Sequence, residues 1–192
     1  MIDDVIEFWF GTEPEPTEET MRRWFVRDDA FDAEIRTRFG ALHARAAAGG
    51  LTDWLATPRG TLALLIVLDQ FSRNLYRDDA RAFAQDGRAL AIARELWFSG
   101  RARELTPIQR MFVLLPFEHA EDREIQREGV AAFEQLAAEP GAPAMLAVGL
   151  DYARRHAEVI ERFGRFPHRN EVLGRESTPE ERAFLQQPGS RF

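Results

Sequence analysis

Apolar residues recur at intervals of three and four positions along nearly the whole chain, and alternation of apolar and polar residues is not sustained anywhere. The first spacing puts apolar side chains on one face of an α-helix, whereas alternation is typical of a half-buried β-strand. The pattern therefore predicts an all-α fold. Helices are expected from Ile2 to Phe10, from near Thr17, from Phe31 to Gly49-Gly50, and at about residues 61–76, 85–99, 107–115, 123–138, 143–163 and 179–187.

The expected helix ends carry local signals. Thr106-Pro107-Ile108-Gln109 and Thr178-Pro179-Glu180-Glu181 each supply a Thr cap, a proline at the first helical position and a Gln or Glu that completes a capping box. Gly100 and Gly164 stand where the left-handed residue that ends a helix is expected. These signals mark helix boundaries independently of the apolar pattern.

Residues 61–76 are apolar on almost every face of the expected helix. A helix of this kind belongs in the centre of a molecule. The connections are short, so consecutive helices are expected to lie antiparallel as hairpins, without a regular sequence repeat. No linker divides the chain, and we expect one all-α domain over residues 1–187, followed by a frayed tail at 188–192.

The composition narrows the chemistry. The chain has 192 residues, a net charge of −7 and no cysteine, and all 25 of its basic residues are arginine. Disulfides, thiolate catalysis, cysteine-bound zinc and lysine Schiff bases are therefore excluded. The negative charge argues against general binding to nucleic acid or to an anionic membrane.

The location predicted from the sequence is cytoplasmic. The longest apolar run, Leu62 to Leu68, is too short to cross a bilayer. The first ten residues contain acids and no basic segment, so they do not resemble a secretory signal.

The first polar group follows the most apolar helix. On a helix Asp69 and Arg73 are neighbours four positions apart, and so are Gln70 and Asn74. A carboxylate and a guanidinium that are buried need partners, because each alone costs several kcal/mol. Two interpretations stay open: an internal salt bridge that fixes the helix end, or the floor of a polar pocket in which Asp69 and Arg73 bind a ligand.

The second polar group is Glu118, His119 and Asp122. Pro116 is expected to kink or end the preceding helix, because it has no N–H to donate. The three side chains would then converge across one turn and form a carboxylate–imidazole base pair, a divalent metal site or ordinary structural hydrogen bonds. The sequence motif of a zinc hydrolase is missing, and no metal site is predicted.

The third polar group is the segment from Gly164 to Glu181, which we call the arginine segment. Guanidinium groups pair with carboxylates or phosphates through two parallel hydrogen bonds. Two interpretations are open: a structural clamp that neutralises acids elsewhere in the fold, or a site that holds an anionic ligand. The candidate ligand-binding residues are Arg165, His168, Arg169, Asn170 and Arg175, and the candidate internal partners are Asp69, Glu118, Glu121 and Asp122.

These stretches together resemble the bacterial family named domain of unknown function 924. The matching stretches are L-I-V-L-D-Q-F-S-R-N-L-Y-R with A-R-A-F-A-Q-D, then P-F-E-H-A-E-D, then E-R-F-G-R-F-P-H-R-N-E-V-L-G-R-E-S-T-P-E-E, with V-I-E-F-W-F-G and R-W-F-V-R-D-D-A-F-D nearer the start. Ser72 departs from the family pattern, in which proline is expected. The resemblance implies an all-helical, tetratricopeptide-like fold, a right-handed stack of hairpins, and it implies no reaction.

The function favoured by the sequence is a binding module with an Arg/His-lined polar pocket for a small anionic ligand or a peptide carboxylate. One alternative is a hydrolase that uses Glu118, His119 and Asp122, with Arg165 or Arg169 stabilising negative charge. Another is a scaffold for protein–protein interaction. Cofactors and the oligomeric state are left open, and neither nucleic acid nor membrane is expected as a partner.

Overall fold

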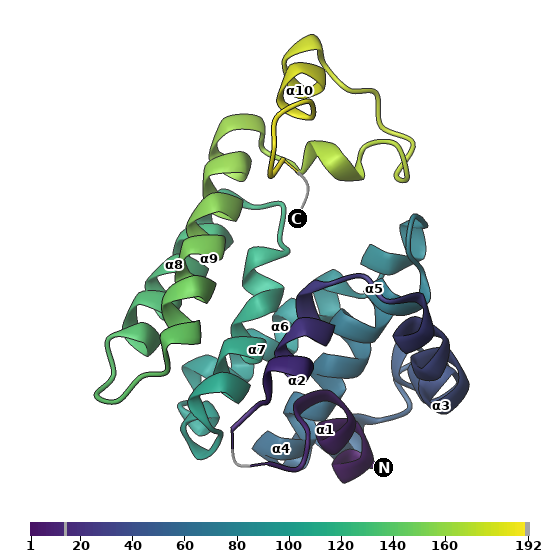
Figure 1. The fold of residues 1–192 in the computed structure, drawn as a ribbon, viewed down its shortest axis with the longest axis vertical. Coiled ribbons are helices and arrows are strands. Elements are labelled where there is room, and N and C mark those ends of the chain that lie inside the picture. Colours follow the sequence, from purple (N-terminus) through teal and green to yellow (C-terminus); the bar gives the residue numbers. More distant parts are fainter. Residues whose placement is uncertain (14, 191–192) are drawn as a thin grey trace. The chain divides into compact units, whose positions relative to one another are not determined.

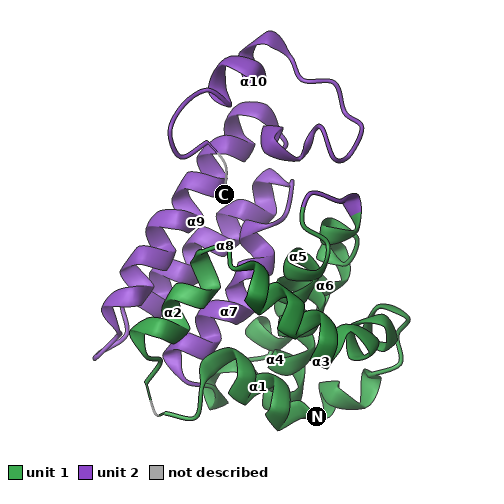
Figure 2. Ribbon diagram, turned by 45° about the vertical axis from the view of Figure 1, so that its right-hand side comes forward, with its two compact units in different colours: residues 1–77, 81–105 green, residues 78–80, 106–192 purple. Residues whose placement is uncertain are grey.

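A computed structural model describes residues 1–13 and 15–190 of the chain, and no β-strand occurs in that part. The all-α prediction is therefore confirmed. The chain groups into two compact units (Figure 2): unit 1 contains residues 1–77 and 81–105, and unit 2 contains residues 78–80 and 106–192. Each unit is described separately, and the single domain expected over residues 1–187 stays a prediction.

Unit 1 is built around one long helical stretch, and its α-helices are labelled in chain order in Figure 1. Its elements are α1 (Ile2–Phe10), α2 (Glu18–Phe25), α3 (Asp29–Ala47), η1 (Thr52–Ala56), α4 (Pro58–Leu65), η2 (Ile66–Gln70), α5 (Phe71–Leu75), α6 (Asp86–Phe98) and η4 (Arg101–Glu104), with η3 (Ala80–Phe83) beginning at the last residue of the 78–80 segment.

The stretch from α4 to α5 lies at the centre of unit 1, as its apolar pattern predicts. α3 packs against η2 and α5, and α1 and α6 pack against α4. The side chains of Leu62, Leu68 and Phe71 are fully buried. One feature differs from the prediction: η2 is a π-helical turn, closed by the N–H of Phe71 donating to the carbonyl of Ile66. Such turns insert one residue into a helix and shift the face of every residue beyond it.

Unit 2 consists of three long helices followed by shorter elements: α7 (Pro107–Glu118), α8 (Arg123–Ala137), α9 (Ala144–Phe163), η5 (Pro167–Arg169) and α10 (Pro179–Phe184). α8 and α9 form an antiparallel hairpin, and both pack against α7 (Figure 1). The antiparallel-hairpin prediction is confirmed here, while the tetratricopeptide-like stack stays a prediction.

Several helix ends differ from the predictions. The central helix begins at Pro58 and not at about residue 61, and α3 spans Asp29–Ala47 and not Phe31 to Gly49-Gly50. α7 does not end at Leu115 but runs through the buried Pro116 to Glu118. α10 ends at Phe184, three residues before the predicted end. Both predicted capping boxes are present, and Gly100 and Gly164 have positive φ.

The last residues of the chain were expected to fray. Within the described part of this tail, Ser190 is buried and its hydroxyl donates to the carbonyl of Leu185. Residues 191–192 lie outside the described residues.

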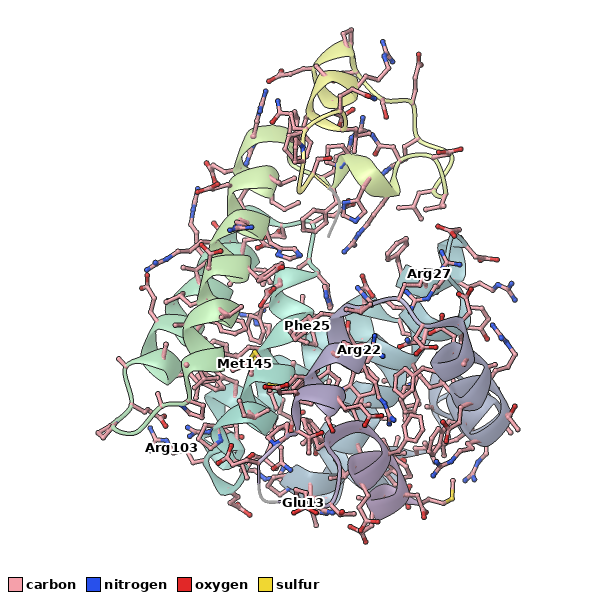
Figure 3. All side chains as sticks on the ribbon, viewed as in Figure 1. Glu13, Arg22, Phe25, Arg27, Arg103 and Met145 are labelled. Carbon is pink, nitrogen blue, oxygen red and sulfur yellow. The ribbon has the colours of Figure 1, made fainter. Side chains whose placement is uncertain are left out.

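None of the helices in the described part of the chain is long and apolar enough to span a bilayer. A few large apolar side chains are exposed, among them Phe25 on α2, which is 59% exposed and is labelled in Figure 3. Val148 and Tyr152 on α9 are also exposed. The cytoplasmic location and the interaction scaffold stay predictions.

Candidate functional site

The arginine segment begins where α9 ends. Gly164 has a φ of 71° and is the left-handed residue at the end of that helix. The chain then forms the short turn η5, an irregular loop and α10, drawn in yellow-green and yellow in Figure 1. Residues Phe166, Pro167, Arg169 and Asn170 are buried, so this irregular stretch is held tightly within unit 2.

Arg175 connects the arginine segment to Glu121 through a salt bridge. Its Nη1 and Nη2 donate to the two carboxylate oxygens at 2.6 and 2.9 Å, and the N–H of Phe166 donates to the same carboxylate at 2.7 Å. Burial alone would raise the pKa of Glu121, but the hydrogen bonds from Arg175 and Phe166 outweigh it and lower that pKa. The predicted pairing of Arg175 with an acid of the fold is therefore present.

Arg165 is paired with Glu181, a partner that the sequence prediction had not named. Its Nε and Nη2 donate to the two carboxylate oxygens at 2.7 and 2.9 Å. The side chain of Asn170 and the N–H of Thr178 donate to the same carboxylate at 3.3 and 2.7 Å. The hydrogen bond from Arg165 is the main cause that lowers the pKa of Glu181 to about 2.

These contacts fit the interpretation of the arginine segment as a structural clamp for three of its residues. Arg165 and Arg175 each engage a carboxylate with two nitrogens, and Asn170 also accepts from the Nε of Arg175 at 3.0 Å. Bidentate pairs of this kind fix both side chains in one orientation. Arg165, Asn170 and Arg175 therefore fix the fold of the segment.

The other predicted residues of the segment, His168 and Arg169, belong to a second group around Phe166. We call this group the imidazole cluster: His119, His156, Phe166, His168 and Arg169. The guanidinium of Arg169 lies over the ring of Phe166 at 4.5 Å. The rings of His156 and His168 each lie 5.6 Å from that of Phe166, and the rings of His119 and His156 are 6.4 Å apart.

Backbone contacts position the cluster. His119 is the C-cap residue of α7, and its carbonyl accepts a hydrogen bond from Nη1 of Arg169 at 3.0 Å. Gln126 on α8 donates to the carbonyls of Glu118 and Ala120 at 2.7 and 2.8 Å. The end of α7 is thus held by side chains from α8 and from the arginine segment.

His156 is the buried base of the cluster. Its Nδ1 lies 2.8 Å from the carbonyl of Tyr152, an acceptor, so this nitrogen carries the proton. The same nitrogen lies 3.4 Å from Oε2 of Glu118. Burial is the main cause that lowers the pKa of His156 to about 3, and the charges of His119, Arg169 and His168 lower it further.

The candidate catalytic residues Glu118 and Asp122 have other neighbours in the structure than the sequence hypothesis gave them. The hypothesis grouped Glu118 with His119, its neighbour in the sequence. In the structure Glu118 is buried and lies beside His156 on α9. Asp122 is the N-cap of α8 and accepts from the N–H groups of Glu124 and Ile125 at 2.8 and 3.0 Å. Asp122 therefore has a structural role, and the predicted pairing of the arginine segment with it is replaced by the pair with Glu181.

Asp69 and Arg73 lie in unit 1. Nη1 of Arg73 lies 3.1 Å from the buried Asp69 carboxylate, and its two terminal nitrogens donate to Asp86, each at 3.0 Å. Opposite charges on Asp69 and Asp86 raise the pKa of Arg73 in spite of its burial, which acts to lower it. The predicted salt bridge is present, and Asp86 is the member that the sequence pattern did not indicate.

The Gln70–Asn74 pair takes a different form. Gln70 donates to the Asp69 carboxylate, and Asn74 donates to Asp32 on α3 at 2.7 Å. Across residues 1–13 and 15–190, no group of three or more His, Asp or Glu side chains is arranged to hold a metal ion.

Comparisons with known proteins identify the family of the chain and a similar fold. The model of the bacterial proteins of unknown function DUF924 matches residues 5–189. The chain belongs to this family. This DUF924 protein is also similar to a solved structure of a protein of unknown function from Agrobacterium tumefaciens. The two share 37% sequence identity over 96% of each chain, with a TM-score of 0.83. Among curated proteins, none matches the chain.

Two residues of the site, His156 and Glu181, were not among the candidate ligand-binding or catalytic residues. His156 lies on the buried face of α9 with Ala153, Val159 and Ile160, and an imidazole on that apolar stripe was the available signal. Glu181 completes the capping box of α10, which explains its place at the helix start but not its second role as the partner of Arg165.

Proposed function

We propose that this protein is a binding module that holds a small anionic ligand or a peptide carboxylate at the imidazole cluster of unit 2. The observation that carries the proposal is that the imidazoles of His156 and His168 and the guanidinium of Arg169 lie around the ring of Phe166, with a third imidazole, that of His119, beside His156. Guanidinium and imidazole N–H groups are the donors that bind carboxylate and phosphate oxygens.

The electrostatic environment supports the same conclusion. Besides burial, the charges of His119, Arg169 and His168 act against protonation of His156. One acid, Glu118, lies beside His156. An anion placed near these groups gains attraction from several of them at once. His119 and His168 are half-buried residues.

The paired arginines contribute rigidity to the proposed site. Arg165 and Arg175 hold the loop on either side of His168 and Arg169 through Glu181 and Glu121. A site whose groups are already ordered loses less conformational entropy when a ligand binds. The proposal therefore assigns Arg165 and Arg175 to the scaffold, and His119, His168 and Arg169 to the ligand.

Thermal unfolding with different anions tests the proposal. Sulfate, inorganic phosphate and a short peptide with a free carboxylate are compared with chloride at equal ionic strength. A ligand at about a hundredfold excess over its Kd adds about 2.7 kcal/mol, a rise in Tm of roughly 5–10 °C for a chain of this size. We expect such a rise for the natural protein and for Arg127→Gln, a control on α8 whose exposed side chain pairs with Glu161.

Arg169→Gln is expected to lose the rise in Tm. If that variant does not fold, His168→Gln replaces it and is expected to reduce the rise. The proposal is wrong if none of the anions stabilises the natural protein more than chloride does. It is also wrong if Arg169→Gln is stabilised as much as Arg127→Gln.

A further inference from the structure

A small cavity lies in unit 1, where η1, α4, α6 and η4 come together. Six residues line it: Leu55, Thr61, Ile92, Glu95, Leu96 and Arg101. The side chains of Ile92 and Leu96 are buried, so part of the lining is apolar. The cavity volume of about 10 Å³ is close to what one water molecule needs, so the cavity can take in a single small group such as a methyl group.

Side-chain hydrogen bonds fix the shape of this cavity. Nη2 of Arg101 donates to the carbonyl of Ala56 at 2.8 Å, and the two terminal nitrogens of Arg101 donate to the carbonyl of Leu55 at 3.4 and 3.5 Å. The hydroxyl of the buried Thr61 also lies 3.5 Å from the carbonyl of Leu55. These contacts connect η4 and α4 to the end of η1.

Glu95 and Arg101 bring opposite charges to the cavity without pairing with each other. Within residues 1–13 and 15–190, neither side chain forms an ion pair, and the guanidinium of Arg101 donates to neutral carbonyl oxygens. Glu95 is exposed and Arg101 is half-buried. A molecule that carries both charges gains a favourable interaction at each end when it bridges the two residues.

We propose that this cavity binds a small zwitterion of the α-amino acid class, and that alanine fits it best. The carboxylate of the ligand pairs with Arg101, and its ammonium group pairs with Glu95 and the hydroxyl oxygen of Thr61. The methyl group enters the apolar part of the cavity, which has no room for a larger side chain. The cavity belongs to unit 1, so this is a second site besides the imidazole cluster of unit 2.

An NMR titration with L-alanine tests the inference through the backbone amide signals of residues that line the cavity. A ligand as small as alanine is expected to bind with a Kd of roughly 1–10 mM. Glycine lacks the methyl group and should bind roughly fourfold more weakly. Leucine is too large for the cavity, and propionate lacks the ammonium group, so each should bind more weakly than alanine by roughly tenfold or more.

Variants assign the two charges. Glu95→Gln and Arg101→Gln are each expected to weaken the binding of alanine by roughly tenfold. Glu95→Gln should not weaken the binding of propionate, because propionate has no ammonium group for Glu95 to hold. Arg103→Gln is the matched control: Arg103 is an exposed arginine on the same η4 and does not line the cavity, so this variant should bind alanine as the natural protein does.

If Arg101→Gln does not fold, Glu95→Gln carries the test, because the side chain that it replaces is exposed. An absence of any shift of these signals at about 50 mM L-alanine would overturn the inference. Binding of leucine as tight as that of alanine would also overturn it, as would equal binding of alanine by Glu95→Gln and Arg103→Gln. These outcomes leave the proposed function untouched, because the imidazole cluster belongs to unit 2 and its signals report on it separately.

Discussion

His156 shows how a single buried residue can tie stability to pH. Its imidazole is neutral in the folded protein because burial and the nearby cationic groups disfavour a second proton, and its pKa falls to about 3. In the unfolded chain the same imidazole titrates near pH 6.5. Below that pH the unfolded state binds a proton that the folded state does not bind, so acid favours unfolding.

The free energy of unfolding should therefore fall as the pH drops from about 6.5 to about 4.5, by about 1.4 kcal/mol per pH unit at most for this one group. Carboxylates titrate mainly below this window, although the buried His43, whose pKa is also lowered by burial, adds to the effect. Urea unfolding at several pH values checks the expectation. His156→Gln should lose clearly less stability across the window, and parallel pH curves for the two proteins would contradict the assignment.

At the scale of elements, α7 and α8 pack closely because α8 has a glycine at the point of contact. A methyl group built on Gly129 would lie 2.8 Å from Cβ of Phe117, a side chain that is fully buried. Carbon atoms do not approach so closely without displacement of one helix. The end of α7, which carries His119, is held partly through this contact.

Gly129→Ala should lower the free energy of unfolding by about 1–3 kcal/mol, because overpacking outweighs the better helix propensity of alanine. Gly40→Ala on α3 is the matched control, since a methyl group there meets no atom within 4 Å. That variant should be neutral or more stable by up to about 1 kcal/mol. Chemical denaturation measures both changes, and an equal gain from the two substitutions would mean that the close approach of the helices is not tight.

The sequence predicted helix ends well where a cap marked them and less well where burial decided them. Thr106, Thr178 and Gly164 act as their local chemistry indicates. α7 continues past Pro116 because the residues that follow, Phe117 and Glu118, are buried in unit 2, and that packing is not visible in a local pattern.

The π-helical turn was hidden for a different reason. An inserted residue is recognised in a sequence when the spacing of apolar and polar residues changes along a helix. Residues 62–68 are all apolar, so no such change can be seen there.

At the scale of the whole molecule, the site depends on contacts between segments far apart in the sequence. The sequence analysis named Glu121 as one of several acids with which the arginine segment could pair, and Arg175 does pair with it. Charge alone gives no preference among these acids. The convergence of His119, His156 and His168 was not predicted, since it follows from the packing of α7, α9 and η5. The sequence shows which residue types are present, but which of them come together can be seen only in the folded structure.

The central claim is that the three arginines of the arginine segment have different roles. Two arginines of the segment hold carboxylates of unit 2, and the third lies over Phe166 among the imidazoles. We propose that this arrangement lets a protein with a net charge of −7 bind an anion at the imidazole cluster. It also separates substitutions expected to reduce stability from substitutions expected to reduce anion binding.

NMR of the imidazole groups tests this claim most directly, because the chain has four histidines and each gives its own signals. The signals are recorded at constant pH with and without sulfate. We predict that sulfate shifts the signals of His119 and His168, which belong to the proposed site, and leaves those of His43 in unit 1 unchanged. Identical signals for all four histidines with and without sulfate would contradict the account.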